Sequence, residues 1–197
     1  MKNKELFQEI EYKNLKKYSV FIPIIEINGE NYIIFEKRSD EISQPGEVSF
    51  PGGALENGET FEEASIRELK EELLLEDDQF ELLGESATKL EENTNRIVKS
   101  FYGKIKIDKD DLRYNEEVSY LIFHKISELK SNPPKVYKCK IEMIPPDDFP
   151  FNKIKNGRDY KFLKASKNMY FYDTDPTIWG LTADLLRVFV EGYTNGK

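Results

Sequence analysis

The chain has 197 residues, a formal net charge of −8, and a composition that is 39% hydrophobic and 34% charged. A chain of this length can fold around one core, because single domains run to about 250 residues, and we expect a single domain over 1–197. Its acidic balance argues against broad electrostatic binding of nucleic acid or of an anionic membrane. A bound cation would reverse the local field of an acidic pocket, so the charge favours a divalent metal as a partner.

Cysteine content and the N-terminal stretch bear on the compartment. Cys139 is the single cysteine, which excludes an intrachain disulfide and a zinc site built from cysteines. The opening stretch MKNKELFQEIEYKNLKKY is charged throughout and lacks the apolar region of a secretory signal. No apolar run reaches the length of a membrane span. We therefore expect a cytoplasmic protein.

The first predicted elements are a helix and a hairpin. Residues 3–16 place apolar side chains at roughly helical spacing among charges, which predicts a short amphipathic helix. The stretches 19–27 and 31–39 flank Asn28-Gly29, a dipeptide suited to the tight turn of a β-hairpin. After a glutamate-rich stretch, further strands are predicted over 79–90, 96–107 and 119–129, the last running into a turn.

The C-terminal part is predicted to hold a long loop and a helix. Residues 131–169 contain two Pro-Pro pairs and no long periodic run, which indicates a long loop or insertion. The last helix is expected to begin with Asp175 as its N-cap and Pro176 at its first position. Its apolar face would carry Ile178, Leu181, Leu185 and Phe189.

The glutamate-rich stretch predicts a helix over 61–74. Thr60 followed by Glu63 fits a capping box at its start. Glu68, Glu71 and Glu72 stand at i, i+3 and i+4, so their carboxylates are neighbours on the helix surface. A solvated acidic face is the plain alternative, because like charges at this spacing cost only a few tenths of a kcal/mol, roughly, per pair.

The residues around this helix occur at fixed spacings, and chance agreement at so many positions is improbable. Gly53 is followed after five residues by Glu59, and after seven more by Arg67-Glu68-Leu69, Glu71-Glu72 and Leu75. This pattern resembles the signature of the Nudix hydrolases, G-x5-E-x7-R-E-U-x-E-E-x-G-U, where U is aliphatic. Leu74 departs from the signature glycine, which ends the helix in that family. The departure concerns the backbone at the helix end rather than the metal chemistry.

The resemblance implies an α/β fold, a Nudix-type α/β/α sandwich with a mixed β-sheet, and hydrolysis of a nucleoside diphosphate linked to another group. It implies Mg²⁺ or Mn²⁺ held by Glu68 and Glu72, with Glu71 and a backbone carbonyl near Gly53 as further ligands. Hard divalent ions prefer such oxygen ligands. By the same resemblance, Arg67 pairs with Glu59 to support the catalytic helix.

A general base is sought on the helix or beyond it. Glu71 is one candidate, and Glu117 is another, because this family often supplies a further carboxylate before the strand that follows it. Glu116 stands beside it as a rival, and an exposed loop charge is the alternative for both.

Two further stretches resemble the coenzyme A diphosphatase branch of the family. Upstream, Arg38, Ser39, Gly46 and Phe50-Pro51-Gly52-Gly53 match its extra motif, although a second basic residue is missing between Ser39 and Gly46. Downstream, PTIWGLTADLLRVF is similar to a segment that opens the last helix of that branch. The resemblance implies substrate contacts from Arg38, Ser39, Phe50 and Trp179.

The expected reaction is cleavage of coenzyme A or its derivatives to 3′,5′-ADP and a 4′-phosphopantetheine product. One alternative is a Nudix enzyme for ADP-ribose or a nucleoside triphosphate. Another is a catalytically silent domain that binds a nucleotide and regulates a partner. The upstream motif argues against the first, and the full set of helix glutamates argues against the second.

Overall fold

The fold was determined as a computed structural model, which describes residues 15–41, 44–91 and 94–193. Its main sheet has seven strands in the described part of the chain, with β3-β2-β1-β6-β5 as the central order, while β4 pairs with β1 and β7 pairs with β2. The sheet is mixed because β1 runs parallel to β6 and antiparallel to β2 and β4. The strands are β1 (Lys16–Ile27), β2 (Glu30–Arg38), β3 (Val48–Ser49), β4 (Gly52–Ala54), β5 (Phe80–Glu91), β6 (Arg96–Ile105) and β7 (Val118–Lys125).

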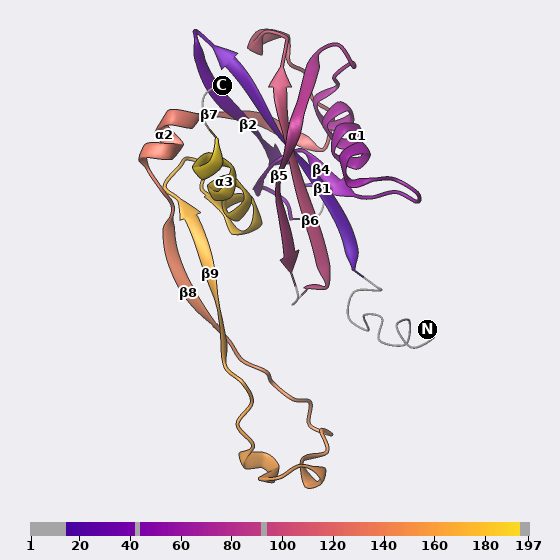
Figure 1. The fold of residues 1–197 in the computed structure, drawn as a ribbon, viewed down its shortest axis with the longest axis vertical. Coiled ribbons are helices and arrows are strands. Elements are labelled where there is room, and N and C mark those ends of the chain that lie inside the picture. Colours follow the sequence, from indigo (N-terminus) through magenta and orange to yellow (C-terminus); the bar gives the residue numbers. More distant parts are fainter. Residues whose placement is uncertain (1–14, 42–43, 92–93, 194–197) are drawn as a thin grey trace, which may run out of the picture.

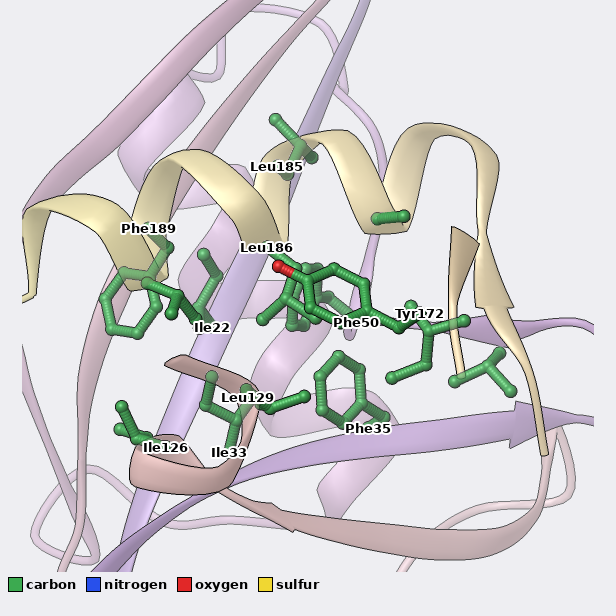
Figure 2. Packing of buried hydrophobic residues seen from close by; sticks show 14 of the residues in the cluster. Ile22, Ile33, Phe35, Phe50, Ile126, Leu129, Tyr172, Leu185, Leu186 and Phe189 are labelled. Atoms are coloured by element: carbon green, nitrogen blue, oxygen red, sulfur yellow. The ribbon is translucent and has the colours of Figure 1, made fainter. Parts of the chain in front are cut away.

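Helices cover both faces of this sheet (Figure 1). Strand side chains alternate between faces, so Phe21 and Ile25 of β1 pack with α1 (Phe61–Leu73) in one apolar cluster. Ile22 and Ile24 belong to the cluster on the other face, with α2 (Ile126–Ser131) and α3 (Gly180–Gly192). Figure 2 shows Phe189 of α3 lying next to Ile22 of the sheet. The predicted α/β/α sandwich with a mixed sheet is therefore confirmed.

Local sequence rules are confirmed at the first hairpin and at the start of α1. Ile27 pairs with Glu30, and the two turn residues between them have positive φ, 53° at Asn28 and 78° at Gly29. Thr60 caps α1: its hydroxyl accepts from the Glu63 N–H at 3.2 Å, and the Glu63 carboxylate accepts from the Thr60 N–H at 2.8 Å.

The end of α1 keeps the backbone shape of the family signature without its glycine. Leu74 lies in the left-handed region, with φ 50° and ψ 45°, and its N–H donates to the carbonyl of Lys70. An L side chain there is strained. The helix therefore ends as the signature requires, at a cost in backbone strain.

The stretch predicted as a long loop or insertion contains two strands, β8 (Lys135–Ile141) and β9 (Ala165–Tyr172). They pair antiparallel and form, with β10 (Ile178–Trp179), a second sheet of three strands in the described residues. We call β8, β9 and the loop between them the ribbon. The ribbon extends away from the main sheet, with its loop at the far end (Figure 1). Short 3-10 turns are η2 (Lys109–Asp111), η3 (Phe151–Lys153) and η4 (Gly157–Asp159).

The predicted start of the last helix is wrong. The helix begins at Gly180, and Ile178 and Trp179 are in β10, paired with Tyr172 and Phe171. The Asp175–Pro176 peptide is cis, and the Ile178 N–H donates to the hydroxyl of Thr174 at 3.1 Å. Strand pairing with the ribbon thus holds this stretch extended, where the sequence alone favoured a helical turn.

Two other predicted elements, the strand over 119–129 and the helix over 3–16, have bounds that differ from the described structure or lie outside it. The strand predicted over 119–129 ends at Lys125, and a short helix, α2, follows it where a turn was expected. Except for 15 and 16, the helix expected over 3–16 lies outside the described residues, and Lys16 is the first residue of β1. None of the helices in the described ranges is long and apolar enough to cross a membrane.

Candidate active site

A cavity of about 700 Å³ brings most of the predicted site residues together. Its walls come from β1, the turn into β4, α1, β9 and the start of α3. The predicted residues that line it are Arg38, Phe50, Gly53, Glu68, Glu71, Glu72, Glu117 and Trp179. The structure thus gathers side chains that are separated by up to 141 positions in the chain.

The two glycines of β4 and the helix carboxylates are in direct contact. β4 pairs with β1, so that Gly52 lies opposite Val20. The Gly52 N–H donates to Glu72 Oε2 at 2.8 Å. A Cβ on Gly53 would stand 2.2 Å from Glu68 Oε1, so only glycine leaves room for this carboxylate in its present place. Gly52 and Gly53 of β4 therefore fix where two of the glutamates lie.

Arg67 braces the same carboxylates from outside the cavity. Its Nε donates to Glu59 Oε1 at 2.9 Å, which confirms the expected ion pair. Its Nη1 donates to Glu68 at 2.9 Å and to Glu71 at 3.1 Å, and its Nη2 donates to the carbonyl of Ala54. One planar guanidinium, with five donors in a rigid fork, thereby ties α1 to β4 and positions two carboxylates.

A further carboxylate beside the helix glutamates, Glu36 on β2, was not predicted. It is 1% exposed. Its Oε1 accepts from the Ser49 hydroxyl at 2.9 Å, whereas its Oε2 is buried without a hydrogen-bond partner. The alternation of β2 was the available clue, because Tyr32, Ile34 and Glu36 point to one face and the first two are apolar. A charge at such a position needs compensation when it is buried.

Burial and mutual repulsion disfavour ionisation of this carboxylate group. Burial, followed by repulsion from Glu36, raises the pKa of Glu72. Burial also raises the pKa of Glu36, against the lowering effect of the Ser49 hydrogen bond. The pKa of Glu68 is likewise raised, mainly by burial, although Arg67 opposes the shift. Negative charge at this place is therefore not fully compensated by the chain.

The donor set suits a hard divalent cation. The acidic side chains that line the cavity here, Glu68, Glu71 and Glu72, carry carboxylate oxygens, which Mg²⁺ and Mn²⁺ prefer. A cation would also relieve the repulsion between Glu36 and Glu72. In the present arrangement, no group of three or more His, Cys, Asp or Glu side chains among the described residues has metal-binding geometry. Glu68 instead contacts Arg67, and Glu72 contacts the Gly52 N–H.

Ser39 contacts the backbone of a cavity residue, Glu117. The residues that the structure describes around the cavity include neither Ser39 nor Arg67. The Ser39 N–H donates to the carbonyl of Glu117 at 2.8 Å, and the Glu117 N–H donates to Asn115 Oδ1 at 2.9 Å. These bonds hold the backbone of Glu117 at the cavity, so Ser39 acts on that residue and makes no direct contact with the cavity.

The cavity has a second polar group that sequence analysis missed. Glu91 at the end of β5 accepts from Arg96 of β6 at 2.7 Å and from Lys167 of β9 at 3.2 Å. All three side chains line the cavity. Lys167 and Glu91 are 76 positions apart, and the ribbon that carries Lys167 was not predicted to contain strands. No local pattern in the sequence could have placed them together.

Comparison with known families matches residues 15–165 to the NUDIX domain. The matched range holds the two glycines of β4, the helix glutamates and Glu117. This chain belongs to the Nudix hydrolase family. Nudix hydrolases act on nucleoside diphosphate derivatives and generally use divalent cations such as Mg²⁺ or Mn²⁺.

The similar proteins do not share one substrate name. Nudix hydrolase 3 of Caenorhabditis elegans is 27% identical over 174 residues, which cover 85% of this chain and 69% of the relative. A peroxisomal coenzyme A diphosphatase of Mus musculus is 39% identical over 69 residues, 34% of this chain and 29% of the relative. An Ap4A hydrolase of C. elegans superposes on 59% of this chain and 85% of its own, with a TM-score of 0.50 and 19% identity. The last likeness concerns the Nudix fold alone.

Proposed function

We propose that this Nudix hydrolase cleaves the diphosphate of coenzyme A or its derivatives to 3′,5′-ADP and 4′-phosphopantetheine or its acyl form. The observation that carries the proposal is the shared cavity. Arg38, Phe50 and Trp179, the substrate contacts implied by the coenzyme A resemblance, line the same cavity as the helix glutamates. The partial similarity to a mouse coenzyme A diphosphatase supports the same substrate class.

Glu68 and Glu72 would hold the metal ion, Mg²⁺ or Mn²⁺, with Glu71 and the backbone carbonyl of Gly53 as further ligands. Bound there, the ion would supply neutralisation of diphosphate charge and a lowered pKa for a coordinated water. The chain itself orients the carboxylate oxygens of these glutamates. The Gly52 N–H and the Arg67 guanidinium hold Glu72 and Glu68 in place before any ligand arrives.

The remaining side chains divide between proton transfer and substrate binding. Glu117 lines the cavity on a different element from α1, and in this proposal it takes the proton of the attacking water, with Glu71 as the alternative. Arg38 contacts a substrate phosphate. Trp179, which is 40% exposed and stacks on Phe171 with ring centroids 5.5 Å apart, offers apolar surface to the pantetheine arm. Phe50 is 3% exposed and stacks on Phe35, so its part in this proposal is to support the cavity wall.

The substrate test compares coenzyme A, dephospho-coenzyme A and ADP-ribose with Mg²⁺ present and products separated by chromatography. We expect kcat/KM for coenzyme A to exceed that for ADP-ribose by about a hundredfold or more, because the extra phosphate and the buried arm add binding contacts. Equal or faster cleavage of ADP-ribose would overturn the coenzyme A assignment. No turnover of any nucleotide would favour a silent binding domain.

The residue test uses matched glutamate variants. Glu72→Gln removes a ligand charge with little change of shape, so activity should fall by orders of magnitude while the protein stays folded. Glu62→Gln, an exposed change on the same helix, should keep normal activity. Glu117→Gln should lower kcat by roughly 10² to 10⁴, the usual worth of a general base, and Glu116→Gln should not. Normal turnover by the Glu72→Gln protein would contradict the metal site.

A further inference from the structure

Glu91, Arg96 and Lys167 form a polar cluster in the same cavity as the glutamates of α1. The Glu91 side chain is 8% exposed, and each of its two oxygens accepts from a different cation. The Arg96 and Lys167 side chains remain 32% and 41% exposed. Three formal charges of this kind sum to a net positive charge, and Glu91 holds the two cations side by side.

The strand register places this cluster apart from the carboxylate end. Gly52 lies opposite Val20 of β1, and Arg96 lies opposite Lys16 of the same strand. Four residues of strand separate these two positions, which is about 13 Å at roughly 3.3 Å per residue. Tyr18 lies between these positions and lines the cavity, as does Val20. The Arg96 guanidinium lies 5.7 Å from the centre of the Tyr18 ring.

The cations have more donors than Glu91 can accept. Arginine carries five N–H donors and lysine three, whereas the hydrogen bonds to Glu91 use one donor from each. Arg96 also donates to the Thr94 hydroxyl at 3.0 Å. Asp184, another carboxylate that lines the cavity, is paired with Lys89 and lies 3.6 Å from Arg187. Its charge is thus compensated by residues other than Arg96 and Lys167.

We propose that Arg96 and Lys167 form a second anion subsite, which binds a phosphate that the substrate carries outside its diphosphate. This inference rests on the proposed function and deepens it. In coenzyme A, one ribose separates the 3′-phosphate from the diphosphate. A substrate whose diphosphate lies at the glutamates of α1 can therefore extend its 3′-phosphate along the cavity toward Arg96 and Lys167. ADP-ribose and dephospho-coenzyme A lack that phosphate. The ribbon thereby contributes to substrate selection through Lys167.

A purely structural role is the competing explanation, because the Lys167–Glu91 pair also ties the ribbon to β5. The two roles differ in what they predict for ligands with and without the second phosphate. If the ion pair only stabilises the fold, its loss changes the affinity for both ligands equally. An anion subsite affects only the ligand that carries the extra phosphate.

The test measures binding of adenosine 3′,5′-bisphosphate and of 5′-AMP by calorimetry with Mg²⁺ present. We expect the wild type to bind the bisphosphate on the order of tenfold more tightly, as a charge-assisted contact predicts. Lys167→Gln and Arg96→Gln should remove most of this preference and leave 5′-AMP binding unchanged. Lys135→Gln is the control, because Lys135 lies on the same ribbon, pairs with the exposed Asp173, and is not among the described cavity residues.

Equal loss of both ligands in the variants, or an unchanged preference, would overturn the subsite. Thermal denaturation checks that each variant is folded, and Lys167→Gln decides alone if Arg96→Gln fails to fold. Turnover separates this inference from the proposed function. If coenzyme A is cleaved but the variants keep the wild-type ratio of its KM to that of dephospho-coenzyme A, the subsite is wrong and the function stands. If coenzyme A is not cleaved but the bisphosphate preference depends on both cations, the function is wrong and the subsite stands.

Discussion

Two adjacent glycines should respond to alanine in opposite ways. At Gly53, a Cβ would stand 2.2 Å from Glu68 Oε1, and ordinary contact begins at 3.4 Å, so the carboxylate must move by at least about 1.2 Å. It is the end of a flexible side chain, which can move without disturbing the backbone. A displacement of about 1 Å in a catalytic group can cost roughly 10² in rate, which corresponds to about 2.7 kcal/mol of transition-state stabilisation. Gly53→Ala should therefore lose activity and keep its stability.

At Gly52, the obstacle is the main chain. A Cβ there would lie 2.5 Å from the Ser19 carbonyl oxygen and 2.7 Å from the Val20 Cα, so strand β1 or β4 must shift. Overpacking of this kind costs about 1 to 3 kcal/mol, or roughly 2 to 12 °C in Tm for a chain of this size. The assay measures kcat of both variants with Mg²⁺, on the substrate that the wild-type enzyme cleaves. Thermal denaturation of both variants is measured in parallel. Wild-type kcat in Gly53→Ala, or a fall in its Tm as large as that of Gly52→Ala, would refute the reasoning.

Two more predictions concern pH and the end of α1. Because the raised pKa values of Glu36 and Glu72 mean that the folded chain keeps protons that the unfolded chain releases, stability in EDTA should fall as pH rises above the ordinary value of 4.5. Thermal denaturation from pH 5 to pH 9, in steps of about one unit, should show a smaller fall in stability for Glu36→Gln and for wild type with Mg²⁺. Parallel curves for wild type and variant would contradict this. Leu74→Gly should be more stable than Leu74→Ala by about 0.5 to 1 kcal/mol in urea unfolding, because only glycine removes the strain of φ 50°. The reverse order would show that Leu74 is unstrained.

Features specified by neighbouring residues could be predicted from the sequence. The Asn28-Gly29 turn and the Thr60 capping box depend on backbone preferences within a few positions, and both are present. The i, i+3, i+4 spacing on α1 likewise places Glu68 and Glu72 at one cavity. In each case the interacting groups are close along the chain, so local geometry is sufficient.

Features that depend on distant partners could not be predicted. Pro176 in the sequence favoured a helix start, but pairing with β9 keeps Ile178 and Trp179 extended. Similarly, β8 lies between two Pro-Pro pairs, which favoured a loop, although Tyr137, Cys139 and Ile141 alternate with lysines along it. The Glu91 cluster requires the ribbon to reach β5, which is a consequence of tertiary structure alone.

The ion pairs of Arg67 bear on whether the chain folds before or after it binds a metal ion. The like charges of Glu68 and Glu71 receive a counter-ion from the chain itself, at 2.9 and 3.1 Å. In small zinc domains the metal supplies the folding free energy, so the chain is unfolded without it. Here the helix can form first, and the metal proposed for this site would enter a protein that is already folded. The ion must then compete with a guanidinium for Glu68, which favours exchange with the surrounding solution over permanent retention.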